Sequence, residues 1–294
     1  METPLISLCQ LSFPDTTFER DIELAMETRV GGLGIAEPKV VRGEEEGLLA
    51  SMTARDLRTS LAVPTTWTIL PPLGGTFPVD PVDPAQRVEE MVLSIRSLAR
   101  LGVPSVMICT GPAGDRSQFD ARKVIVEAIQ VLAAIAGEEG TSLSIEPMRE
   151  DFRPIRTMVC SLPETLDLLD EVGDDTVGIV FDTWHMWDSE GLAETLEDAI
   201  PRFHAVQIAD YREPTRGPLD RVPAGQGVSD LPRILAMLQA AGFSGWYDLE
   251  VFSDDGRYGS SYPDSYWNLD PLAFARKQVD GFLECWRASD ETGG

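Results

Sequence analysis

The chain has 294 residues, and its 49 acidic and 24 basic residues give a formal net charge of −25. A surface this acidic excludes a protein that holds the phosphate backbone of nucleic acid electrostatically, and it disfavours docking on anionic lipid. Hydrophobic residues make up 43% of the chain, which permits a large core and argues against global disorder. A chain of this length forms either two ordinary domains or one large α/β barrel.

The pattern predicts a cytoplasmic protein without a membrane span. No apolar run reaches the ~18–20 residues needed to cross a bilayer, and the start Met1-Glu2-Thr3-Pro4 lacks the basic and apolar stretches of a signal peptide. Only two histidines are present, which excludes a multi-zinc centre built mainly from imidazoles. The cysteines have no CxxC spacing, so we expect free thiols at Cys9, Cys109, Cys160 and Cys285.

Eight short apolar runs bounded by Gly, Pro or Asp predict β-strands. Amphipathic stretches with helical spacing lie between them, as in 86–101 and 121–136. Eight such units predict a single (β/α)8 TIM barrel, and a doubly wound open sheet is disfavoured because no GxGxxG follows the first strand. The predicted strands are residues 5–11, 32–36, 60–68, 105–109, 142–146, 177–182, 205–208 and 246–251.

No Ser/Gly linker divides the chain, so we expect residues 1–287 to form one barrel and 288–294 to form a frayed tail. Two long loops, 211–227 and 253–270, follow the last two strands and should lie over the carboxyl-terminal mouth. The run Glu44-Glu45-Glu46 is expected to be a solvated helix start.

Polar residues follow the apolar runs of the fifth to eighth strands. Each would be costly to bury alone, and three carboxylates at one mouth would repel one another unless a divalent cation joined them. The alternative to a metal site is that these are four separate strand-end residues, each with its own hydrogen bonds. Because all four are hard oxygen donors, the sequence predicts an Mn²⁺ site, with Mg²⁺ or Co²⁺ as alternatives to it. The proposed ligands are Glu146, Asp182, Gln207 and Glu250.

Further mouth residues each have a functional and a structural interpretation. Glu37 either contacts substrate or caps the next helix, and Trp67 either stacks on a sugar or plugs the mouth. His185 either donates to a substrate oxygen or packs between tryptophans. Arg221 is either a substrate clamp or a salt bridge, and His204 should face the helices because of strand alternation. Weaker candidates for the clamp are Arg149, Arg212 and Arg216.

Several motifs resemble the xylose isomerase-like TIM-barrel superfamily of sugar isomerases and epimerases. The resemblance rests on Glu146-Pro147, the Asp182-x-x-His185 pattern, VQIAD at 206–210 and RVPAGQG at 221–227. Gln207 stands where many members have His, as in the hydroxypyruvate isomerase branch. Parts of the pattern also resemble C-glycoside deglycosylase subunits, although Met148-Arg149 replaces the His expected after the Glu-Pro pair.

The resemblance implies a divalent-metal-dependent isomerase or epimerase of a small sugar, keto-sugar or hydroxy-keto acid. It implies proton abstraction next to a carbonyl, through a metal-stabilised enediolate, with Glu146 and Glu250 as the catalytic pair. A lyase remains open, either an inosose-type dehydratase or a C-glycoside deglycosylase, and so does a non-catalytic sugar-binding barrel. The aromatic residues of the mouth loops also fit a contact within a homo-oligomer.

Overall fold

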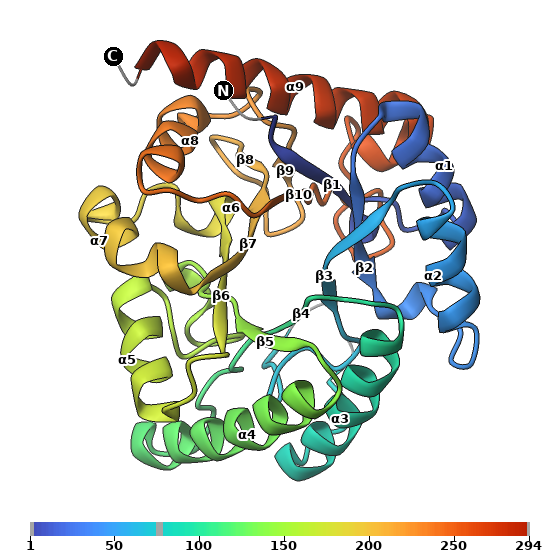
Figure 1. Cartoon of the computed structure of the whole chain (residues 1–294). Helices are drawn as coiled ribbons and strands as arrows, with labels where there is room; N and C mark the ends of the chain where they lie inside the picture. Colours follow the sequence, from blue (N-terminus) through green and yellow to red (C-terminus); the bar gives the residue numbers. More distant parts are fainter. Residues whose placement is uncertain (1–2, 75–78, 293–294) are drawn as a thin grey trace.

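The computed structural model describes residues 3–74 and 79–292. Eight parallel strands close into a barrel in the order β1-β10-β7-β6-β5-β4-β3-β2, with helices around the outside (Figure 1). The predicted single (β/α)8 TIM barrel is therefore confirmed. The barrel strands are β1 (Leu5–Cys9), β2 (Gly32–Ala36), β3 (Arg58–Val63), β4 (Ser105–Ile108), β5 (Ser142–Ile145), β6 (Gly178–Asp182), β7 (Phe203–Ile208) and β10 (Trp246–Leu249).

Capping side chains begin several of the helices. Thr17, Ser117 and Ser161 each accept a hydrogen bond from a backbone N–H in the first turn of the helix that follows. The last helix, α9, lies between α8 and α1 and completes the outer ring (Figure 1). The helices are α1 (Phe18–Thr28), α2 (Glu45–Thr53), α3 (Pro84–Arg100), α4 (Gln118–Glu138), α5 (Leu162–Val172), α6 (Thr183–Met186), α7 (Leu192–Ala199), α8 (Leu231–Ala240) and α9 (Pro271–Thr292).

Several strands are shorter than the sequence predicts, and β3 and β1 show why. β3 ends at Val63 instead of residue 68 because Pro64 follows, and proline has no N–H to donate to the ladder. β1 ends at Cys9, where a 3₁₀ turn, η1 (Gln10–Ser12), begins. The strand ends nevertheless stay at the mouth, so these differences leave the predicted site residues at the same end of the barrel.

The carboxyl-terminal segment forms helix where a frayed tail was expected. α9 continues to Thr292, and Ser289 is buried with its Oγ 2.6 Å from the carbonyl oxygen of Trp286. Ser289 Oγ also accepts a hydrogen bond at 3.0 Å from Gln239 Nε2 of α8. The backbone is therefore helical through Thr292, Ser289 contacts α8, and residues 293–294 lie outside the described part.

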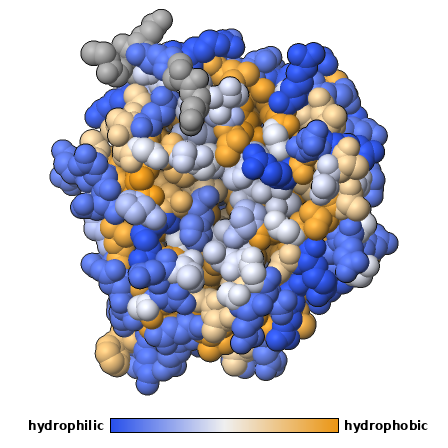
Figure 2. Space-filling model, in the orientation of Figure 1, coloured by the Kyte–Doolittle hydropathy of each residue, from blue (hydrophilic) through white to orange (hydrophobic). Residues whose placement is uncertain are grey.

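Hydrophilic side chains dominate the periphery of the molecule, hydrophobic patches lie among them, and the centre of the view is of intermediate hydropathy (Figure 2). Among the described residues, no helix combines the length and the apolar character that a bilayer span requires.

His204 is oriented against the expectation from strand alternation. Phe203 and Ala205 pair with consecutive residues of β6, which leaves His204 as the extra residue of a bulge. Its ring occupies the space above Gly178, where a Cβ would lie 2.4 Å from the ring. Nδ1 of His204 lies 2.8 Å from Ser144 Oγ, so the ring turns toward β5 instead of facing the helices.

A buried carboxylate ties α2 to α3. α2 begins at Glu45, but this residue is only 2% exposed and is not part of a solvated helix start. Its carboxylate accepts hydrogen bonds from Ser97 Oγ at 2.6 Å, Arg100 Nη2 at 2.9 Å and Gly43 N at 2.8 Å. Burial raises the pKa of Glu45, but the hydrogen bonds together outweigh burial and lower the pKa from 4.5 to about 2.

We predict that Glu45→Gln lowers the free energy of unfolding at neutral pH by about 1–3 kcal/mol. Because the folded-state pKa is depressed, ionised Glu45 stabilises the fold above its unfolded pKa, and this stabilisation is lost as the pH falls toward about 2. Urea unfolding of both proteins at decreasing pH should show the difference shrinking. A difference that stays constant with pH would contradict this role, and Glu44→Gln at the exposed neighbouring position is the control.

Candidate active site

The side chains predicted as ligands meet at the carboxyl-terminal mouth of the barrel. Glu146 and Glu250 directly follow β5 and β10, Asp182 ends β6, and Gln207 lies in β7. All four are buried, and none is more than 3% exposed. Gln207 Nε2 donates to Glu250 Oε1 at 2.8 Å, and ligand atoms of Glu146, Asp182 and His185 lie within 4.8 Å of one another. Strands that neighbour one another in the barrel thus bring the four side chains together.

Arg221 bridges two of these carboxylates. Its Nη1 donates to Asp182 Oδ2 at 2.7 Å and to Glu250 Oε2 at 2.9 Å. The guanidinium carbon lies 4.7 Å from the centre of the Trp184 ring and 4.5 Å from that of Phe252. A buried guanidinium between two aromatic rings therefore offsets part of the repulsion between the carboxylates.

The loop that carries Arg221 is ordered around the carboxylate of Asp210. It contains an antiparallel pair, β8 (Asp210–Tyr211) and β9 (Arg221–Val222). Asp210 Oδ2 accepts hydrogen bonds from Gly225 N at 3.0 Å and Gly227 N at 2.9 Å, and Oδ1 accepts two further backbone N–H groups. A Cβ on Gly227 would lie 2.4 Å from the Asp210 carboxylate, so this turn requires glycine. The RVPAGQG turn is thus fixed by hydrogen bonds from its backbone N–H groups to the Asp210 carboxylate.

His185 is placed as a hydrogen-bond donor to the site. Its Nδ1 accepts a hydrogen bond from Arg149 N at 3.3 Å, which assigns the ring hydrogen to Nε2. Nε2 lies 3.9 Å from Glu146 Oε1 and 3.8 Å from Asp182 Oδ2. Burial lowers the pKa of His185 well below 6.5, and nearby arginine charges lower it further, so the ring is neutral at pH 7.

The carboxylates are held in a strongly unfavourable environment for negative charge. Burial is the main reason that the pKa values of Glu146, Asp182 and Glu250 are raised, and the charge of Asp182 adds to the rise at Glu146. Two buried thiols, whose own pKa values burial raises, donate to the predicted catalytic pair. Cys109 Sγ lies 3.2 Å from Glu146 Oε2, and Cys9 Sγ lies 3.5 Å from Glu250 Oε1.

The residues at this point fit a divalent metal ion. Gln207 Oε1 is buried and has no hydrogen-bond partner among the described residues, although its amide nitrogen is bonded to Glu250. A buried acceptor without a hydrogen bond costs free energy unless a ligand binds it. Ligand atoms of Glu146, Asp182 and His185 are close enough to one another to hold one ion, and the unbonded Gln207 Oε1 lies on the neighbouring strand β7.

Two predicted site residues, Glu37 and Trp67, have contacts with neighbouring strands and helices. Glu37 Oε2 accepts hydrogen bonds from Thr65 N at 2.8 Å and from Ser94 Oγ of α3 at 2.7 Å, so its carboxylate joins the end of β2 to the helical layer. Trp67 is half-buried and packs against the core, and its carbonyl oxygen accepts a hydrogen bond from Cys109 N at 2.7 Å. The substrate-binding role expected of these two residues stays a prediction.

The weaker arginine candidates form ion pairs around the rim. Arg149 makes a two-pronged contact with Asp188 at 3.0 and 3.2 Å, while Arg212 and Arg216 both contact the buried Asp220. Sequence reasoning missed the thiols described above, although Cys109 ends a predicted strand and Cys9 lies near the end of another.

The chain belongs to the family described as Xylose isomerase-like TIM barrel, whose pattern matches residues 39–278. Among solved structures, a protein from Sinorhizobium meliloti aligns with a TM-score of 0.80 and 23% identity over 96% of this chain and 98% of that one. The IOLI protein, solved with a zinc atom, aligns with a TM-score of 0.76 and 17% identity over 95% and 97%. These structural likenesses show the fold.

Two curated relatives match shorter segments. An inosose isomerase of Bacillus velezensis is 27% identical over 137 residues, which cover 45% of this chain and 48% of the relative. A 3-dehydroshikimate dehydratase of Pseudomonas putida is 24% identical over 194 residues, which cover 64% of this chain and 29% of the relative. The chain therefore spans about half, or less, of the length of these relatives.

We predict that Asp210→Ala releases the turn that holds Arg221. The substitution removes the acceptor of several backbone N–H groups, and the free energy of unfolding should fall by about 1.5–3 kcal/mol. Hydrogen exchange of the amides at Gly225 and Gly227 should become at least about tenfold faster. Unchanged protection of these amides would contradict the positioning role, and Asp188→Ala on the outer rim is the matched control.

Proposed function

We propose that the chain is a divalent-metal-dependent isomerase or epimerase of a small sugar, keto-sugar or hydroxy-keto acid. The observation that carries this proposal is the buried group of Glu146, Asp182 and His185, to which Arg221 links Glu250 by contacting both Asp182 and Glu250. Carboxylates so close together and so far from water need more positive charge than one guanidinium supplies. Membership of the xylose isomerase-like family and the match to an inosose isomerase support this reaction class.

The proposed metal ligands are Glu146, Asp182, Gln207 and Glu250. A divalent ion bound there supplies positive charge for the oxygens of the substrate that become more negative during proton abstraction. Mn²⁺ is the proposed ion because the donors are hard oxygens, with Mg²⁺ and Co²⁺ as alternatives. The zinc atom in the IOLI structure makes zinc the competing outcome of a metal analysis.

Glu146 and Glu250 are the proposed proton-transfer pair. They follow β5 and β10, which are separated in the barrel by β6 and β7, so they face the space between them from two sides. One carboxylate removes a proton next to the carbonyl, and the other returns a proton to the opposite face, which gives epimerisation. Return of the proton at the neighbouring carbon gives isomerisation. His185 Nε2–H donates to a substrate oxygen, and Arg221 holds Glu250 in place.

A dehydratase is the alternative, and the match to 3-dehydroshikimate dehydratase favours it. The same proton removal, followed by loss of a hydroxyl group from the next carbon, gives elimination of water. The residues of the site serve both outcomes, since both begin with a base close to a polarised carbonyl.

We predict that the Mn²⁺-loaded protein incorporates solvent deuterium next to the carbonyl of its substrate, and that Glu146→Gln and Glu250→Gln each slow this exchange by about 100-fold or more. Proton NMR of ketoses and inososes recovered from D₂O measures the exchange and identifies the product. Full exchange in either variant would contradict the assignment. Appearance of an unsaturated product would move the assignment to the dehydratase, and Glu44→Gln is the surface control.

A further inference from the structure

The proposed ligands lie on neighbouring strands, and a cysteine lies on the strand at either side of them. Part of the barrel order runs β1-β10-β7-β6-β5-β4, and the ligands lie at or near the ends of the four middle strands (Figure 1). Cys9 is the last residue of β1, and Cys109 follows the last residue of β4. The two thiols therefore lie at opposite ends of the row of ligands, which are, in strand order, Glu250, Gln207, Asp182 and Glu146.

Each thiol contacts the glutamate on the strand next to it. Cys109 Sγ lies 3.2 Å from Glu146 Oε2, and Cys9 Sγ lies 3.5 Å from Glu250 Oε1. These glutamates are the two members of the proposed proton-transfer pair. An ionised carboxylate only accepts hydrogen bonds, so the S–H group is the donor in both contacts. None of the four side chains is more than 3% exposed, so bulk water does not compete for these bonds.

The bond from Cys109 selects which oxygen of Glu146 faces the rest of the site. The last torsion of a glutamate side chain is soft, so the chain alone does not fix the plane of its carboxylate. With Oε2 at the thiol, Oε1 lies 3.9 Å from His185 Nε2. His185 Nε2 is in turn 3.8 Å from Asp182 Oδ2. A donor on the far oxygen thus directs the near oxygen of Glu146 toward the group that is to hold metal and substrate.

Glu250 is oriented by its thiol together with two further donors. Gln207 Nε2 donates to Oε1, the oxygen that also accepts from Cys9, and Arg221 Nη1 donates to Oε2. These donors come from β7, β1 and β9, so they reach the carboxylate from different directions. Loss of Cys9 would leave the other two donors in place, and its effect should be smaller than that of losing Cys109.

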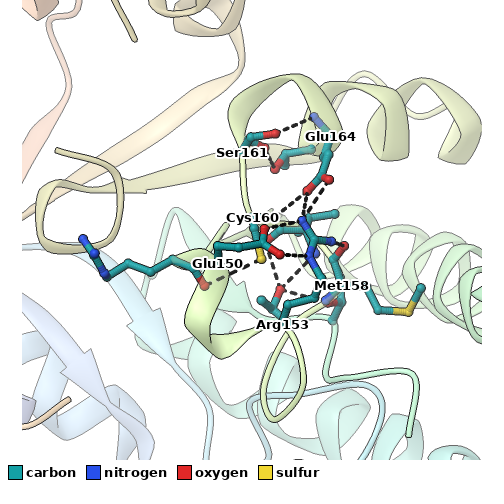
Figure 3. Close-up of polar contacts among 11 residues, drawn as sticks. Glu150, Arg153, Met158, Cys160, Ser161 and Glu164 are labelled. Atoms are coloured by element: carbon teal, nitrogen blue, oxygen red, sulfur yellow. Dashed lines mark hydrogen bonds and ion pairs between the residues drawn. The ribbon is translucent and has the colours of Figure 1, made fainter. Parts of the chain in front are cut away.

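Two other buried cysteines provide controls away from the glutamates. Cys160 lies in the loop between β5 and α5, with its Sγ 3.6 Å from the carbonyl oxygen of Arg149. Arg153 holds this loop independently of the thiol, since its Nη1 donates to the carbonyl oxygen of Met158 at 3.0 Å (Figure 3). Cys285 is buried on α9. Removing either thiol should leave Glu146 and Glu250 in place.

We propose that Cys109 and Cys9 are positioning residues, whose S–H groups hold Glu146 and Glu250 in the orientation that proton transfer requires. This inference rests on the proposed function, because it concerns the same two carboxylates. Groups that hydrogen-bond to metal-ligating carboxylates orient them, and small errors in the position of a reacting group slow a reaction strongly. The alternative is that the thiols only fill space at the end of the barrel.

The test measures deuterium exchange of D-fructose and of an inosose in D₂O by the Mn²⁺-loaded protein. At saturating substrate, Cys109→Ala should slow exchange by about tenfold or more and Cys9→Ala by about fivefold or more, with KM changed less than about twofold. Serine keeps a hydrogen-bond donor of similar size, so Cys109→Ser and Cys9→Ser should stay within about twofold of wild type. Cys160→Ala and Cys285→Ala should also stay within about twofold.

Wild-type rates in both alanine variants, or serine variants as slow as the alanine ones, would overturn the positioning role in favour of space filling. Equal losses in both control variants would overturn it as well. Urea unfolding confirms that each variant is folded before its rate is compared.

A crystallographic measurement separates this inference from the proposed function. In the metal-free protein, the Glu146 carboxylate should turn away from its wild-type orientation in Cys109→Ala and keep that orientation in Cys109→Ser. An unchanged carboxylate in Cys109→Ala would overturn the inference. Absence of exchange by the wild-type protein with both probes would contradict the proposed function, and the orientation of Glu146 then decides the role of the thiol by itself.

Discussion

Three acidic side chains share a buried space at the mouth of the barrel, and the arrangement around them reduces the cost of keeping them there. Burial and mutual repulsion both oppose negative charge on Glu146, Asp182 and Glu250. Arg221 neutralises part of this charge, and a buried thiol donates to each of the two glutamates. A group of this kind lowers the stability of the metal-free fold, and a doubly charged ion would recover that loss on binding.

Two clamps outside the site fix its sides independently. On one side, the carboxylate of Asp210 accepts hydrogen bonds from backbone N–H groups and so fixes the turn that carries Arg221. On the other side, Arg153 holds the loop after β5. Both clamps use polar contacts within loops instead of strand pairing. A TIM barrel supports many reactions in this way, because the loops change while the strands keep the donors in register.

Strand pattern predicted the fold, and the strand-end positions of the proposed ligands lie at one end of the barrel, because both follow from local pattern. Gln207 points inward with the carboxylates, since β7 keeps its register next to β6 at that residue. His204 was assigned to the wrong face because a bulge, which leaves no signature in this sequence, changes the alternation three residues earlier. Glu37 lies at a strand end but is bound by α3. Only three-dimensional packing decides such positions.

The most direct test of the account is the anomalous diffraction of crystals grown with Mn²⁺. We expect one strong peak within bonding distance of carboxylate oxygens from Glu146, Asp182 and Glu250, with Gln207 Oε1 turned toward it and His185 Nε2 left to donate. No peak at this position at saturating Mn²⁺, or a peak bound by His185 while Gln207 stays turned away, would contradict the central claim.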